Sequence, residues 1–95
     1  MFTQEEIDTF AKSTFHIAIG RQSETTETNI DLIKKSWSQL SPTAKEYIEN
    51  FLSNEVDSHN KIISSPGHND FLMTNLGDNI NASRWIDFLS WIDIN

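Results

Sequence analysis

The chain has 95 residues, of which 37% are apolar, and it contains no cysteine. Its fourteen acidic and seven basic side chains give a formal net charge of −7. This length supports one domain with one modest core, and the lack of cysteine excludes disulfide bridges and thiolate metal sites. No apolar run approaches the ~20 residues of a membrane-spanning helix. The sequence therefore predicts a soluble single domain over residues 1–95, with no membrane contact.

The distribution of charged residues indicates which partners to expect. Binding to a phosphate backbone needs clustered basic side chains, and Lys34 and Lys35 are the only adjacent pair, so we expect no direct binding to nucleic acid. A basic protein is the complementary partner, although an acidic surface can serve solubility alone. Residues 1–6 carry acidic side chains where a secretory signal peptide would be basic and then apolar, so we expect a cytoplasmic protein.

The first helix is predicted to start after Thr3, because Thr3 and Glu6 have the spacing of a capping box and Phe2 and Ile7 that of a hydrophobic staple. Gly20 is its expected end. One broad arc of this helix carries the expected core residues, which are Ile7, Phe10, Ala11, Thr14, Phe15, Ile17 and Ala18.

The polar residues 21–27 are predicted to form a connection or a frayed first turn, after which Thr28 and Asp31 offer a cap for a second helix. Apolar residues at helical spacing mark the buried face of this helix: Ile30, Ile33, Trp37 and Leu40. Ser41 and Pro42 indicate a tight corner, since proline is favoured in the first turn of a helix.

A third helix is predicted from the corner to about residue 56, with Ala44, Tyr47, Ile48, Phe51 and Leu52 on its apolar face. A short helix over about 69–76 follows, and Asn81 or Ser83 is expected to cap a terminal helix. No segment alternates as a strand would. The sequence therefore predicts an all-α bundle of four to five helices.

The terminal helix carries more large apolar side chains than one buried stripe can hold. Four of them share a face and are expected in the core, namely Trp85, Phe88, Leu89 and Ile92. Trp91 projects about 100° away from that face, together with Asp87 and Ile94. This edge is a predicted contact surface. Helix one or the loop over residues 78–82, a second copy in a homodimer, or a foreign partner could equally cover it.

A second predicted contact surface is the acidic side of the third helix, where Glu46, Glu49 and Asp57 share one face. Carboxylates on a rigid helix can pair with Arg and Lys of a partner, although such a face is more often simply solvated.

No catalytic set is visible. Phosphate-binding glycine loops and a nucleophile elbow are both absent from the sequence. His16 is expected to be exposed and without a role. Glu55 and His59 are one turn apart, but two ligands do not make a metal site, and the H-E-x-x-H spacing is missing. We therefore expect no enzyme, no cofactor and no metal.

A small acidic helical protein without cysteine or catalytic groups is typical of immunity proteins, antitoxins and phage-encoded blockers of host defence. The expected function is therefore inhibition of a basic partner, such as a nuclease, by occlusion through Glu46, Glu49, Asp57, Asp87, Trp91 and Ile94. The alternative is a structural or adaptor subunit that forms a homodimer or larger homo-oligomer through the terminal helix.

Overall fold

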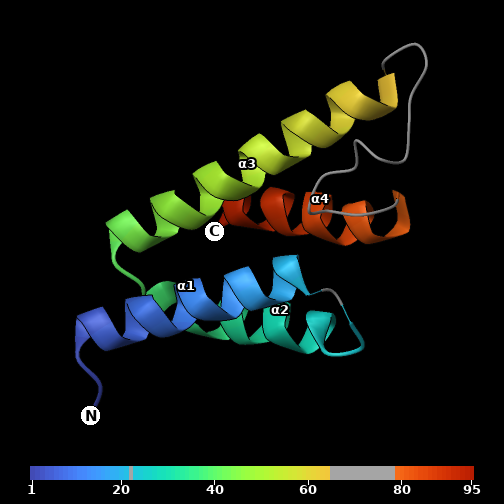
Figure 1. Cartoon of the computed structure of the whole chain (residues 1–95). Helices are drawn as coiled ribbons and strands as arrows, with labels where there is room; N and C mark the ends of the chain where they lie inside the picture. Colours follow the sequence, from blue (N-terminus) through green and yellow to red (C-terminus); the bar gives the residue numbers. More distant parts are fainter. Residues whose placement is uncertain (22, 65–78) are drawn as a thin grey trace. The chain divides into compact units, whose positions relative to one another are not determined.

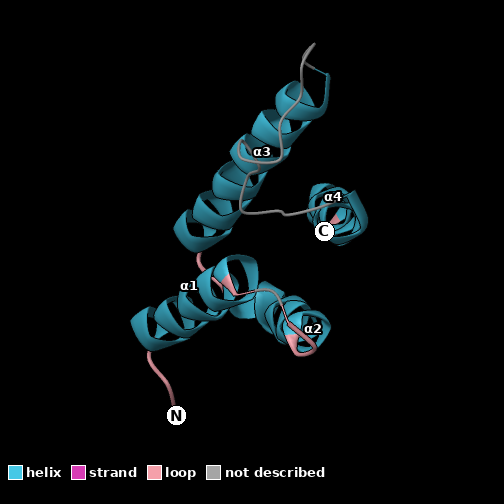
Figure 2. Ribbon diagram, turned by 45° about the vertical axis from the view of Figure 1, so that its right-hand side comes forward, coloured by secondary structure: helices cyan, strands magenta, loops and turns pink. Residues whose placement is uncertain are grey.

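A computed structural model of the chain describes residues 1–21, 23–64 and 79–95, and Figures 1 and 2 show the helices that these residues form. Within these ranges no strand is formed, which confirms the all-α class. The elements in chain order are α1 (Gln4–Gly20), α2 (Thr26–Ser36), the 3-10 turn η1 (Trp37–Gln39), α3 (Pro42–Ser64) and α4 (Asn79–Ile94). The short helix predicted over 69–76 lies outside the described residues.

The chain divides into two compact units, Met1–Ile48 and Glu49–Asn95. The boundary falls inside α3, so the first unit contains α1, α2, η1 and the first turns of α3, and the second contains the remainder of α3 with α4. Each unit is described by itself below.

The predicted capping box at the start of α1 is confirmed. Thr3 N donates to Glu6 Oε1 at 3.1 Å, and Glu6 N donates to Thr3 Oγ1 at 3.1 Å, so both ends of the motif are satisfied. The helix also ends at Gly20, as predicted. Its start is therefore fixed by side chains within one turn.

The core face of α1 is narrower than predicted and rotated. Its buried residues are Ala11, Thr14, Phe15, Ala18 and Ile19. Phe10 and Ile17, both expected in the core, are 59% and 58% exposed, whereas Ile19 was missed. The apolar arc is wider than one packing neighbour can cover, and only the flank that contains Phe15 and Ile19 is enclosed.

The start of α2 differs from the prediction, because the helix begins at Thr26 and Thr28 lies within it. Ser23 N donates to Thr26 Oγ1 at 2.8 Å, and Thr26 N donates to Ser23 O at 3.2 Å. Thr26 has no exposed surface, so its hydroxyl anchors the turn. This polar residue gave no hydropathy signal in the sequence.

The predicted buried face of α2 is confirmed, because Ile30, Ile33, Trp37 and Leu40 are each at most 5% exposed. The helix tightens into the 3-10 turn η1 at Trp37, although the apolar spacing continues to Leu40. α1 and α2 pack against each other within the first unit (Figure 1).

The corner before α3 also forms where predicted. Pro42 is the first residue of α3, and Ser41 Oγ accepts a hydrogen bond from Ala44 N at 3.2 Å, as a capping serine does. The same hydroxyl donates to Asp8 Oδ2 on α1. The corner before α3 is therefore hydrogen-bonded to α1.

In the second unit, α3 extends to Ser64, well beyond the predicted end near residue 56. Val56 and His59 are 8% and 5% exposed, so the buried face continues through a histidine that the hydropathy pattern counted as polar. α4 begins at Asn79, ahead of both predicted caps, Asn81 and Ser83.

The predicted core of α4 is confirmed at three of four positions. Trp85, Phe88 and Ile92 are at most 5% exposed, whereas Leu89 is half-buried.

Candidate functional site

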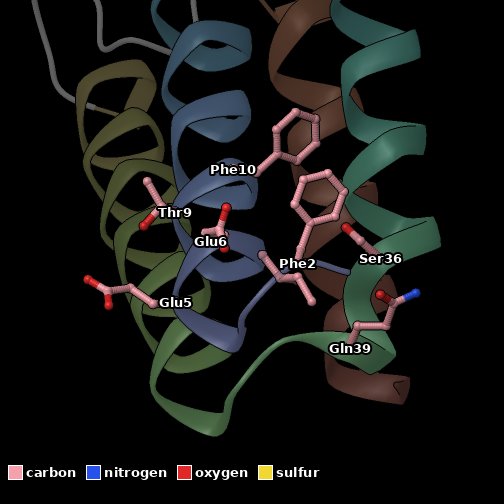
Figure 3. Close-up of a pocket in the computed structure, with 8 residues that line it drawn as sticks. Phe2, Glu5, Glu6, Thr9, Phe10, Ser36 and Gln39 are labelled. Atoms are coloured by element: carbon pink, nitrogen blue, oxygen red, sulfur yellow. The ribbon is translucent and has the colours of Figure 1, made fainter.

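A groove on the first unit is formed by described residues alone. It lies between the first half of α1 and the end of α2 with η1, and its volume is about 710 Å³ (Figure 3). The lining residues are Phe2, Glu5, Glu6, Ile7, Thr9, Phe10, Ser36 and Gln39.

The walls of this groove are apolar and open to solvent. Phe2 is 75% exposed and Phe10 is 59% exposed, and Ile7 between them in the sequence is half-buried. Figure 3 shows the rings of Phe2 and Phe10 directed into the space between α1 and α2, where both line the groove. Because these two aromatic side chains are largely exposed to water, covering them would release hydrophobic free energy.

The local sequence helps to explain why Phe2 lies at the groove. Phe2 immediately precedes the capping residue Thr3, and the capping box fixes how the chain enters α1. Phe10 lies on the flank of α1 that the core leaves uncovered. The staple pattern of Phe2 and Ile7 was therefore a signal for this groove, although it was interpreted as helix capping alone.

A hydrogen bond connects the two walls, and others join α1 to the corner before α3. Gln4 Nε2, on α1, donates to Gln39 O in η1 at 2.8 Å and to Asp8 Oδ1 at 2.8 Å. Asp8 in turn accepts from the Ser41 backbone N–H at 3.0 Å and from Ser41 Oγ at 2.6 Å. These bonds hold the pKa of the Asp8 carboxyl below its ordinary value, with the Ser41 hydroxyl as the largest cause. The groove is therefore pre-formed on linked elements.

The rim of the groove is polar and acidic, with no basic side chain among the lining residues. Glu5 and Glu6 are both exposed. Glu6 accepts from Thr3 N through Oε1 only, so its second oxygen can face a ligand. Ser36 Oγ instead donates to the carbonyls of Leu32 and Ile33. Glu5 and Glu6 are thus the charged groups of the lining.

The acidic residues predicted on α3 are accessible to different degrees. Glu46 and Asp57 are exposed, and Glu49 is half-buried. Glu46 belongs to the first unit, whereas Glu49 and Asp57 belong to the second.

The predicted edge of α4 is only partly an outward surface. Asp87 is exposed and Ile94 is 84% exposed, but Trp91 is half-buried. The Trp91 ring lies 6.1 Å from the Phe88 ring and is tilted by 43°, and Phe88 lies 6.3 Å from Trp85. Trp91 therefore extends the aromatic row of the core face.

His16 is exposed, as predicted, and its Nε2 lies 2.7 Å from the hydroxyl of Tyr47. Lys12 Nζ lies 5.4 Å from the centre of the Tyr47 ring. These three residues border a second, shallower hollow with Thr9, Ser13 and Ile17. The sequence did not indicate it, because Tyr47 is far from His16 along the chain and was expected in the core.

The pair of Glu55 and His59 lies on α3, with Glu55 half-buried and His59 buried. Nowhere in the described ranges do three or more His, Cys, Asp or Glu side chains gather as metal ligands would. In the same ranges, no helix combines the length and the apolar character needed to cross a bilayer.

The groove combines an apolar wall with two carboxylates, Glu5 and Glu6. No family of proteins, no curated protein and no solved structure matches the chain.

Proposed function

We propose that this chain is a protein-binding module that inhibits a basic partner by occlusion, in the manner of an immunity, antitoxin or anti-defence protein. One observation carries the proposal. Large apolar side chains at Phe2 and Phe10 stay exposed beside Glu5 and Glu6, on a protein of net charge −7. An aromatic anchor surrounded by charge is the composition of an interface hot spot and its rim.

Further carboxylates support a basic partner. Glu46, Asp57 and Asp87 are exposed, and carboxylates on helices form strong charge-assisted bonds with Arg and Lys. Complementary charge mainly accelerates encounter, and its effect is screened within about 10 Å at 0.1 M salt. The partner would lose access to its own ligand while covered.

The experiment is capture from cells of the source organism, followed by identification, kinetics and an activity assay of the captured protein. We expect a protein of basic surface whose activity falls when the chain is added. Its association rate should decrease steeply from low to high salt. A rate that is independent of salt, or a captured protein that keeps full activity in the complex, contradicts the proposal.

A further inference from the structure

We propose that the groove between α1 and α2 seats a basic amphipathic helix of a protein partner, whose apolar face covers Phe2, Ile7 and Phe10 while its lysine or arginine side chains meet Glu5 and Glu6. This inference rests on the proposed function and names the chemistry of the partner at one site.

The size and exposure of the groove favour a protein segment. A volume of about 710 Å³ exceeds what one side chain occupies, so several apolar side chains can enter together. Pockets for small molecules bury most of the ligand surface, yet here Phe2 and Phe10 are themselves largely exposed. A small ligand bound there would remain exposed to solvent, whereas a helix would cover both rings.

The shape of the site selects a helix in particular. The walls are α1 on one side and the end of α2 with η1 on the other, as Figure 3 shows. An amphipathic helix lays its apolar face into such a groove through side chains at i, i+3, i+4 and i+7. The hydrogen bond from Gln4 to Gln39 holds the two walls together before binding, which lowers the entropic cost of ordering the site.

Charge complementarity determines the polar face of the occupant. The lining includes two carboxylates and no basic side chain. Acidic residues on an entering helix would face Glu5 and Glu6 and be repelled, whereas Lys or Arg would be attracted. The occupant is therefore basic on the side that borders the apolar face.

The chain offers a matched pair of variants. Phe10 and Ile17 are both on α1 and are 59% and 58% exposed, but only Phe10 lines the groove. Glu6→Gln removes a charge while glutamine still fits the capping box. Glu24→Gln removes an exposed charge outside the groove. Circular dichroism of each variant checks that the helices remain.

The probe is a fluorescein-labelled helical peptide of ~18 residues made of leucine and lysine, long enough for about five turns. Its leucines lie on one face. Two control peptides carry glutamate in place of lysine or serine in place of leucine. Binding is measured by fluorescence anisotropy at low salt, and light scattering at the same concentration reports whether two copies of the chain associate.

We expect Phe10→Ser to weaken binding of the leucine–lysine peptide by about tenfold or more, since burial of an aromatic side chain contributes that much to affinity. Ile17→Ser should change affinity by less than about twofold, and Glu6→Gln should weaken binding more than Glu24→Gln. Both control peptides should bind poorly. Equal effects of Phe10→Ser and Ile17→Ser, tight binding of the glutamate peptide, or self-association through Phe10 would overturn the inference.

The inference and the proposed function can fail separately. If Glu46→Gln, Asp57→Asn and Asp87→Asn slow binding of a captured basic protein while Phe10→Ser has no effect, the groove inference is wrong and the inhibitor function stands. If the peptide binds the groove as described but the captured protein remains active in the complex, the inhibitor function is wrong and the groove inference stands.

Discussion

Ser41 Oγ donates a 2.6 Å hydrogen bond to Asp8 Oδ2, and the backbone N–H of Ser41 donates to Oδ1 of the same carboxylate at 3.0 Å. One side chain of α1 thus holds both groups of the residue that caps α3. The hydroxyl has a double role, because it also accepts from Ala44 N.

Asp8→Asn should lower the stability of the protein at neutral pH and make that stability less dependent on pH in the acidic range. The native pKa of Asp8 lies below its ordinary value of 3.8, so its contribution is complete above that value and is lost as the pH falls through the native pKa. Urea midpoints measured from about pH 5 to pH 3 should therefore fall less in Asp8→Asn than in the wild type.

Asp31→Asn is the control, because Asp31 is exposed on α2. It should keep the wild-type slope over the same pH range. If the urea midpoint of Asp8→Asn falls with pH as steeply as that of the wild type, the Ser41 hydrogen bonds do not favour the ionised carboxylate.

Thr3→Ala should destabilise the first unit by about 1 kcal/mol, because it leaves the Glu6 backbone N–H without its capping acceptor. Thr9→Ala, an exposed change within α1, should be neutral or slightly stabilising since alanine is the better helix former. Urea denaturation followed by circular dichroism compares the two. Equal stability of both variants would show that the capping box contributes nothing.

Local chemistry explains which parts of the fold could be predicted. The capping box at Thr3 and the Ser41 corner depend on residues within one turn, so the sequence contained them. The burial of Thr26 was missed because a polar side chain gives no hydropathy signal, and its hydrogen bonds with Ser23 form only in the folded turn. His59 is also counted as polar by hydropathy, although it is buried.

The groove could be predicted only in part. Periodicity identified the wide apolar arc of α1, but it could not determine which flank another element would cover. The sequence therefore predicts Phe10 in the core, and its place beside the groove depends on how α1 packs against α2, which no local pattern contains.

Trp85→Ala should cost about 3 to 5 kcal/mol, because the side chain has no exposed surface and its removal leaves a cavity. Trp91→Ala should cost about 1 to 2 kcal/mol, since the ring is half-buried and contacts Phe88. Urea denaturation monitored by the far-ultraviolet signal gives both values. Comparable losses in the two variants would place Trp91 fully in the core and remove it from the predicted contact residues.

Ile94→Ser should change stability by less than about 0.5 kcal/mol, because the side chain is 84% exposed. Light scattering at micromolar concentration should report a monomer for the wild type and the variant alike. A wild-type dimer that Ile94→Ser dissociates would instead support the homo-oligomeric adaptor as the function.

The boundary between the compact units falls between Ile48 and Glu49, within the first third of α3. A truncated chain that stops there would keep fewer than two turns of this helix, too few to be stable by themselves. Fragments meant to isolate the groove should therefore extend through more of α3. Binding measured on a shorter piece would report a frayed end rather than the surface that the intact chain presents.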